Sequence, residues 1–161
     1  VDALAAAVSL PPDDVVTSTH PPQVASVGLP FVIAQLRDRS ALERAMPVLP
    51  ALEAIGSLGI VPDIHLYVHD TGGLDLRARM FAPLDGVPED PATGSANCAL
   101  VALLGALGST PDGIRRWRIA QGVEMGRPSV LEASVVKRSG RNVKMFHCAL
   151  SGNASLNRSC T

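Results

Sequence analysis

The stretch 95–107 is apolar on every side of the helix that its spacing predicts. Leucines recur at helical intervals along it, while alanines and Val101 make the opposite side apolar as well. A helix that is apolar all round is surrounded by protein. It is also shorter than the roughly 20 residues that a membrane span needs. The rest of the chain must therefore build a shell around this helix.

Strand patterns lie on both sides of the helix. Apolar or alternating runs predict strands over 23–27, 29–36, 65–68, 74–81, 116–121, 129–136 and 142–150, and short helices over 1–8, 40–46 and 51–58. In 74–81, alternation predicts one buried face and one polar face that carries Arg77 and Arg79. Strands before and after one buried helix predict an α+β fold, with a curled mixed sheet around a central helix. We expect one domain over 1–150 and a frayed or divergent tail over 151–161.

Local signals punctuate these elements. Residues 70–73 (DTGG) predict a hairpin turn, because glycine adopts the positive φ angles that such turns require. Ser139 and Gly140 predict a second turn, between the last two strands. Ser40, with Glu43 three residues later, predicts the N-cap of the helix over 40–46.

Composition excludes several classes of protein. Hydrophobic residues make up 47% of the 161 residues and charged residues 18%, so the chain is not of the disordered type. With 14 basic and 15 acidic residues, it has no basic surplus for nucleic acid. Residues 1–10 lack a basic signal region, and Cys98, Cys148 and Cys160 have no metal-ligand spacing, so we expect a cytoplasmic protein without metal or cofactor. A helical opening without Met predicts that something precedes Val1.

The loop that enters the apolar helix carries the best chemical candidates. Thr93, Gly94 and Ser95 stand where the first turn of a helix leaves backbone N–H groups without partners. The helix dipole favours an anion there, so a substrate carboxylate is a natural ligand. The alternative is that Thr93 or Ser95 merely caps the helix. The spacing leaves both interpretations open.

Asp90 is the candidate acid or base of this loop. It precedes Pro91, which favours an extended backbone and brings the carboxylate toward the same helix end. A carboxylate in a partly apolar loop can act as a general acid or base. The alternative is a capping aspartate. The neighbouring Glu89 is expected to be solvated and structural.

Three segments together resemble a known family. The run RMFAPLDGVPEDPATGSANCALVALL (79–104) closely resembles the second-half motif of the PhzF family of phenazine-biosynthesis-like isomerases, which have the diaminopimelate-epimerase-like fold. VASVGLPFVIAQL (24–36) and IAQGVEMGRPSVLEASV (119–135) support the resemblance. It implies one lobe of a two-lobed protein, made of a curled mixed sheet around a central helix, with the active site between the lobes.

The resemblance also implies roles for residues. Asp90 matches the acidic residue of the motif, while Gly94 and Ser95 match positions that bind the acidic group of the substrate or assist proton transfer. The principal acid/base of the family, a glutamate near a Gly-Asn-Pro turn, and a Gly-His motif belong to the first lobe, and neither motif occurs here. Related racemases use a cysteine in this loop, but residues 90–93 contain none. Proton transfer by carboxylates is therefore preferred.

Two hypotheses follow. The first is a cofactor-independent isomerase of a small carboxylate-bearing substrate, which performs a proton shift or epimerisation and is incomplete without a first lobe or a second chain. The second is a non-catalytic remnant or interaction module with a PhzF-like lobe. In either case, a lobe face without its mate exposes apolar surface, so we expect a homo-oligomer.

Overall fold

The structure, a computed structural model, describes residues 1–70, 72–108 and 112–139, together with the backbone of 141–150. Its strands are β1 (Val15–Val16), β2 (Gln23–Ser26), β3 (Pro30–Leu36), β4 (Ile64–His69), β5 (Leu76–Ala82), β6 (Val87–Asp90), β7 (Gly113–Gln121), β8 (Ser129–Arg138) and β9 (Arg141–Leu150). Its α-helices are α1 (Asp2–Ala7), α2 (Arg39–Arg44), α3 (Leu49–Ser57) and α4 (Gly94–Leu107). Two short 3-10 helices are η1 (Pro12–Asp14) and η2 (Pro83–Asp85).

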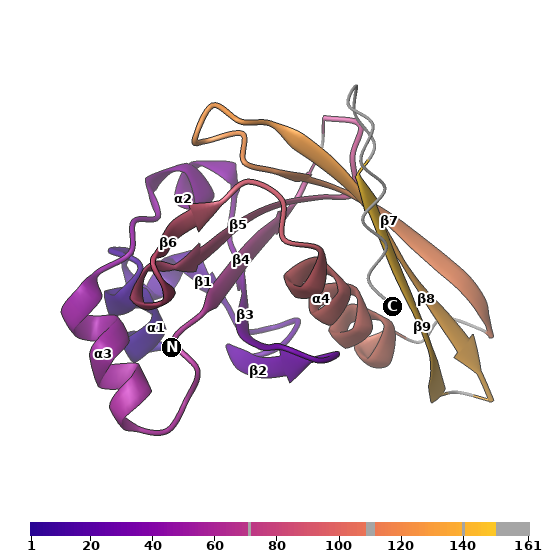
Figure 1. Cartoon of the computed structure of the whole chain (residues 1–161), viewed down its shortest axis with the longest axis horizontal. Helices are drawn as coiled ribbons and strands as arrows, with labels where there is room; N and C mark the ends of the chain where they lie inside the picture. Colours follow the sequence, from indigo (N-terminus) through magenta and orange to yellow (C-terminus); the bar gives the residue numbers. More distant parts are fainter. Residues whose placement is uncertain (71, 109–111, 140, 151–161) are drawn as a thin grey trace.

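The strands of the described residues form one mixed sheet. Its order is β1-β3-β4-β5-β7-β8-β9, while β2 pairs with β3 and β6 with β5. The pairs β3–β4 and β5–β7 are parallel, and the others are antiparallel. Figure 1 shows the sheet curling so that α4 lies between the β2–β5 part and the β7–β9 part, and α4 contacts β2, β3, β7, β8 and β9. The predicted α+β fold with a curled mixed sheet around a central helix is confirmed.

The sheet separates two apolar cores. The outer core lies between the sheet and α1–α3, and its strand residues include Val32, Ala34, Leu36, Ile64, Leu66 and Val68. The inner core lies between the sheet and α4, and its strand residues include Phe31, Ile33, Tyr67, Leu76, Ala78 and Met80. Successive residues of a strand point to opposite faces, so β3 and β4 supply both cores from one apolar run each.

The prediction of one polar face for the strand over 74–81 was wrong. All seven residues of β5 are buried, including Arg77 and Arg79, which are each 7% exposed. β5 lies inside the sheet, and α2 and the outer core cover the face that carries the arginines. Alternation in the sequence identified which residues share a face, but it could not show that both faces are covered.

Other local predictions had mixed outcomes. The hairpin between β4 and β5 is confirmed, and Gly73 has a φ of 102°. The N-cap of α2 is Asp38 and not Ser40, because the Asp38 carboxylate accepts from Ala41 N at 2.8 Å. The turn between β8 and β9 begins at Ser139, with a φ of 52°.

The expectation of complete enclosure holds for only part of α4. Residues 96–101 are buried, whereas Leu107, at the end of the helix, is 48% exposed. Gly140 and the tail 151–161 lie outside the described residues. No helix in the described part of the chain is long and apolar enough to cross a membrane.

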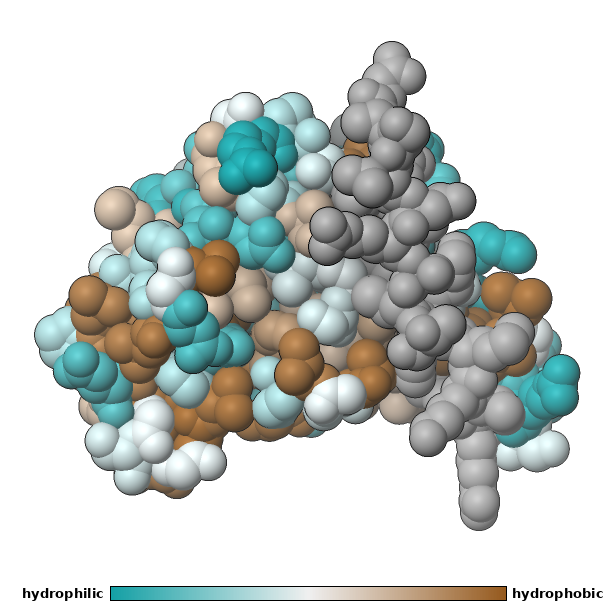
Figure 2. Space-filling model, viewed as in Figure 1, coloured by the Kyte–Doolittle hydropathy of each residue, from teal (hydrophilic) through white to brown (hydrophobic). Residues whose placement is uncertain are grey.

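Apolar side chains reach the surface around α3. Figure 2 shows brown patches over the part of this face where α3 lies. The large exposed apolar residues of α3 and its neighbouring segments are Met46, Leu49, Leu58, Ile60, Leu84 and Val87. The homo-oligomer predicted from the sequence stays a prediction.

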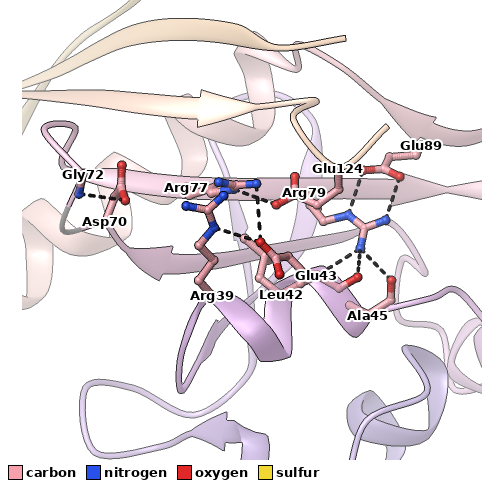
Figure 3. Close-up of polar contacts among 10 residues, drawn as sticks. All are labelled: Arg39, Leu42, Glu43, Ala45, Asp70, Gly72, Arg77, Arg79, Glu89 and Glu124. Atoms are coloured by element: carbon pink, nitrogen blue, oxygen red, sulfur yellow. Dashed lines mark hydrogen bonds and ion pairs between the residues drawn. The ribbon is translucent and has the colours of Figure 1, made fainter. Parts of the chain in front are cut away.

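Arg79 joins three segments on the outer side of the sheet (Figure 3). Its Nε and Nη2 donate to the two carboxylate oxygens of Glu89 at 2.8 and 2.9 Å. Its Nη1 donates to the carbonyl oxygens of Leu42 and Ala45 at 2.9 and 2.7 Å. These carbonyls belong to the last turn of α2 and to its C-cap residue, where the regular donors four residues later are no longer helical. One guanidinium thus fixes β6 and the end of α2 to β5.

Arg77 makes a second connection from the same strand. Its Nε donates to Glu124 Oε1 at 2.6 Å, and both side chains are almost fully buried. The Oε1 atom of Glu43 in α2 lies 3.9 Å from Arg77 Nη2. Figure 3 shows the two arginines side by side, each directed to a different acid. The two pairs tie the segment before α4 and the turn after β7 to the same strand.

We expect Arg79→Met to lower the free energy of unfolding by about 3–5 kcal/mol, because it leaves the carboxylate of Glu89 buried without its partner. Chemical denaturation measures the loss. Arg118→Met is the matched control, since Arg118 is 55% exposed and lies 3.9 Å from Glu132. The control should change stability by less than about 1 kcal/mol. Similar losses in the two variants would contradict the structural role of Arg79.

Candidate functional site

The structure places the candidate residues of the loop at the start of α4. Asp90 is the last residue of β6 and pairs in the sheet with Met80 of β5. Thr93 is the N-cap residue of α4, and Gly94 and Ser95 are its first helical residues. Thr93 Oγ1 donates to Asp90 Oδ2 at 2.6 Å. The predicted proximity of Asp90 to the helix end is confirmed, whereas the functional roles stay predictions.

Thr93 does not cap the helix with its side chain. Its hydroxyl is directed to Asp90, and α4 has no side-chain hydrogen bond at its N-cap. The first intrahelical bond of this end is Asn97 N to Thr93 O, at 3.1 Å. The preceding amides, those of Gly94, Ser95 and Ala96, therefore point out of the helix with no intrahelical acceptor. Of the alternatives left open by the sequence, simple capping by Thr93 is the one that this geometry disfavours.

Behind Thr93 lies a buried amide pair that the sequence analysis missed. Gln121, the last residue of β7, donates through Nε2 to Asp90 O at 2.7 Å and to Thr93 Oγ1 at 2.9 Å. Asn97 of α4 donates through Nδ2 to Gln121 Oε1 at 2.7 Å and to Thr93 O at 2.9 Å. Both amide side chains belong to residues that are 0% exposed. Buried amides with several partners hold their neighbours in one geometry.

His65 of β4 completes the group. Its Nε2 lies 3.3 Å from Asn97 Oδ1, and Nδ1 is buried without a hydrogen-bond partner. Burial lowers the pKa of His65 from 6.5 to about 4, although the hydrogen bond to Asn97 acts in the opposite direction. The imidazole is therefore neutral near pH 7. We call His65, Asn97, Gln121, Thr93 and Asp90 the Asp90 network.

Close packing and an ion pair hold the loop that carries Asp90. Gly122 has a φ of +74°, and a Cβ there would lie 2.9 Å from the Cα of Pro91 and would collide with the carbonyl oxygen of Arg127. Only glycine allows this approach. On the other side of Asp90, Glu89 is bound by Arg79. The expectation that Glu89 is solvated was therefore wrong, and its structural role comes from this ion pair.

The sequence held weak signals for the missed residues. Asn97 interrupts the apolar run of the central helix, and Gln121 closes a strand inside a segment that resembles the PhzF family. His65 lies in the strand predicted over 65–68, where nothing in the local sequence indicates a buried polar contact. The structure buries His65 and exposes His69. Among the described residues, no three His, Cys, Asp or Glu side chains cluster closely enough to hold a metal ion.

The pKa of His65 predicts a pH dependence of stability. The unfolded chain takes up a proton at His65 below about pH 6.5, whereas the folded chain does so only near pH 4. The contribution of His65 to the free energy of unfolding is therefore fully present above pH 6.5. It is lost between pH 6.5 and about 4, which lowers the free energy of unfolding by up to about 3 kcal/mol. Denaturant unfolding at pH 7 and 4.5 measures the loss.

His65→Gln should lose less stability than the unchanged protein over this pH interval, because it removes the titrating group. His69→Gln is the matched control on the same strand. It should keep the pH dependence of the unchanged protein, since His69 is exposed. Identical pH profiles for the unchanged protein and His65→Gln would contradict the prediction.

The chain is similar in sequence to proteins described as isomerases. An uncharacterized isomerase from Deinococcus radiodurans is 41% identical over 127 residues, which cover 75% of this chain and 40% of that protein. A trans-2,3-dihydro-3-hydroxyanthranilate isomerase from Pseudomonas chlororaphis is 36% identical over 112 residues, which cover 67% of this chain and 39% of that protein. The chain thus spans less than half the length of these two relatives.

Solved structures have the same fold. A phenazine biosynthesis protein of the PhzF family from Bacillus anthracis superposes with a TM-score of 0.73 at 22% identity, covering 84% of this chain and 46% of that one. A protein described as a predicted epimerase from Pseudomonas aeruginosa superposes with a TM-score of 0.60 at 35% identity, covering 81% and 43%. Residues 2–159 match the family described as phenazine biosynthesis-like protein (PhzC-PhzF), and the chain belongs to this family.

Proposed function

We propose that this chain supplies one lobe of a cofactor-independent isomerase that shifts a proton within a small carboxylate-bearing substrate. The observation that carries the proposal is the carboxylate of Asp90, held 2.6 Å from Thr93 Oγ1 beside the uncapped start of α4. Membership of a family whose relatives are isomerases supports the reaction class. The trans-2,3-dihydro-3-hydroxyanthranilate isomerase supports a carboxylate-bearing substrate.

The two parts of the site have different tasks in this proposal. The amides of Gly94 and Ser95, together with the helix dipole, bind the carboxylate of the substrate. Asp90 relays a proton as the substrate loses one at one position and regains one at another, and it shares this task with the principal acid/base of the first lobe, so that no atom is gained or lost. Ser95 assists by hydrogen bonding to the substrate. A bound carboxylate would thus hold the reacting atoms near Asp90, which is the main benefit of such a site.

The proposed site is completed by another lobe. The chain covers 40% and 39% of the two isomerases, and the resemblance implies a principal acid/base glutamate in the first lobe. We propose that this lobe belongs to a longer form of the protein or to a second chain. A non-catalytic interaction module with a PhzF-like lobe is the competing function, and the exposed apolar side chains of Leu49, Leu58 and Ile60 around α3 favour it.

Isotope exchange separates the two functions. The chain is incubated in D₂O with trans-2,3-dihydro-3-hydroxyanthranilate, both alone and mixed with the first-lobe polypeptide of the Deinococcus radiodurans isomerase. Proton NMR then follows deuterium entering the substrate. Incorporation above the rate of the first-lobe polypeptide alone would support the isomerase. No incorporation under either condition, with this substrate and with a panel of small unsaturated acids and amino acids, would favour the interaction module.

We expect Asp90→Asn to lower the rate of deuterium incorporation by about 100-fold or more, because it removes the acid–base group. Asp85→Asn is the matched control, since Asp85 is an exposed acid of the same loop. The control should retain the rate. Circular dichroism and thermal unfolding should show that both variants are folded. An Asp90→Asn variant as fast as the unchanged protein would contradict the role of Asp90.

We expect Gly94→Val to weaken carboxylate binding, because a branched side chain at the first helical position crowds the amides that bind the anion. Titration with anthranilate, followed through the amide signals of Ser95 and Ala96, measures the dissociation constant. Gly108→Val is the control at the opposite end of α4, where φ is −73°, a backbone angle that residues other than glycine adopt. Equal binding by the two variants would argue against an anion site at Gly94.

A further inference from the structure

The contacts of the two buried amides fix how each is oriented. Asn97 Nδ2 donates to Gln121 Oε1 and to Thr93 O, so Asn97 Oδ1 is the atom that faces His65 Nε2. Gln121 Oε1 accepts from Asn97 and from Thr93 N, so Gln121 Nε2 is the donor to Thr93 Oγ1 and to Asp90 O. Exchanging the oxygen and nitrogen of Asn97 would bring acceptors against acceptors, and exchanging those of Gln121 would bring donors against donors.

The orientation of the amides sets the direction of every other bond. An oxygen of Asn97 accepts from His65, so the imidazole carries its proton on Nε2 and its lone pair on the unpartnered Nδ1. Thr93 Oγ1 accepts from Gln121, so the Thr93 hydroxyl proton points to Asp90 Oδ2. Each group therefore donates to the next, from His65 to the carboxylate. Bonds in a chain of one direction polarise one another and strengthen the last of them.

We propose that His65, Asn97 and Gln121 are positioning residues that hold Asp90 in one orientation. In this orientation Oδ2 is occupied by the Thr93 hydroxyl, so Oδ1 is the oxygen that exchanges a proton with the substrate. The inference rests on the proposed function of Asp90. It adds three residues from β4, α4 and β7 to a site that the sequence confined to one loop.

Position and burial support a role in orientation. His65, Asn97 and Gln121 are each 0% exposed, so they cannot touch a substrate at the surface. Asp90 is partly exposed, and its Oδ1 has no hydrogen-bond partner among the described residues. The network thus donates to one carboxylate oxygen and to the backbone carbonyl of Asp90, and leaves the other carboxylate oxygen to solvent or substrate. A reacting group displaced by about 1 Å can lose about 100-fold in rate, so such an orientation matters for proton transfer.

Thr93 offers a matched pair of variants. Thr93→Val keeps the shape of the side chain and removes the hydroxyl, while Thr93→Ser keeps the hydroxyl. Three-bond NMR couplings of the 161-residue chain report the χ1 rotamer of Asp90. We expect a single rotamer in the unchanged protein and in Thr93→Ser, and loss of the single rotamer in Thr93→Val. Averaged couplings in the unchanged protein, or one rotamer in all three proteins, would overturn the proposal.

Nitrogen NMR of the unchanged protein gives a second test that does not depend on any variant folding. His65 should carry its proton on Nε2 near pH 7. A proton on Nδ1 would reverse the direction of the chain and overturn the proposal.

Kinetics connect the orientation to the reaction. In the assembly with the first lobe, Thr93→Val should lower kcat by about 10- to 100-fold with a smaller change in KM, and Thr93→Ser should restore most of the rate. A purely structural role would lower stability without separating kcat from KM. If no assembly incorporates deuterium, the proposed function fails, while the couplings and the His65 tautomer still decide the positioning.

Discussion

The largely buried ion pair of Arg79 and Glu89 is the interaction on which the geometry of this site depends. Removing either partner would strand a charge in the protein interior, where it is poorly solvated. The pair lies on the outer face of the sheet. Because Glu89 directly precedes Asp90 in β6, the ion pair also fixes the backbone position of Asp90. The same guanidinium binds the last carbonyls of α2. The packing of a helix and the placement of the candidate acid thus share one side chain.

The site is held from both faces of the sheet. On the outer face, Arg77 binds Glu124 in the turn that follows β7. On the inner face, Gln121 at the start of that turn binds the backbone of Asp90. Gly122 lies between these contacts and lets the turn pack against Pro91. Because the loop has partners on both sides, Asp90 can remain partly exposed without depending on solvent for its position.

Much of the fold could be predicted from the sequence because its signals are local. The apolar helix, the hairpin through residues 70–73 and the strands of the last third all follow from spacing and turn chemistry. The buried face of Arg77 and Arg79 could not be predicted, since the same alternation occurs in strands with one face in water. The site was predicted in part. Its loop residues are adjacent in sequence, whereas Asn97 and Gln121 are 24 residues apart and His65 and Asn97 are 32 apart.

The sequence by itself determined the periods of the elements, the place where the central helix starts and the family resemblance carried by residues 79–104. The local backbone conformation depends mainly on residues that are adjacent in the sequence, and the polarity of each side chain is known from its residue type. Both can therefore be inferred without a structure. Only the tertiary structure decided that Thr93 donates to Asp90. It also decided that the buried amide of Gln121 on β7 donates to Thr93 and accepts from Asn97 on α4. Hydrogen-bond direction depends on which donors and acceptors meet after folding, and burial then removes the water that would otherwise replace them.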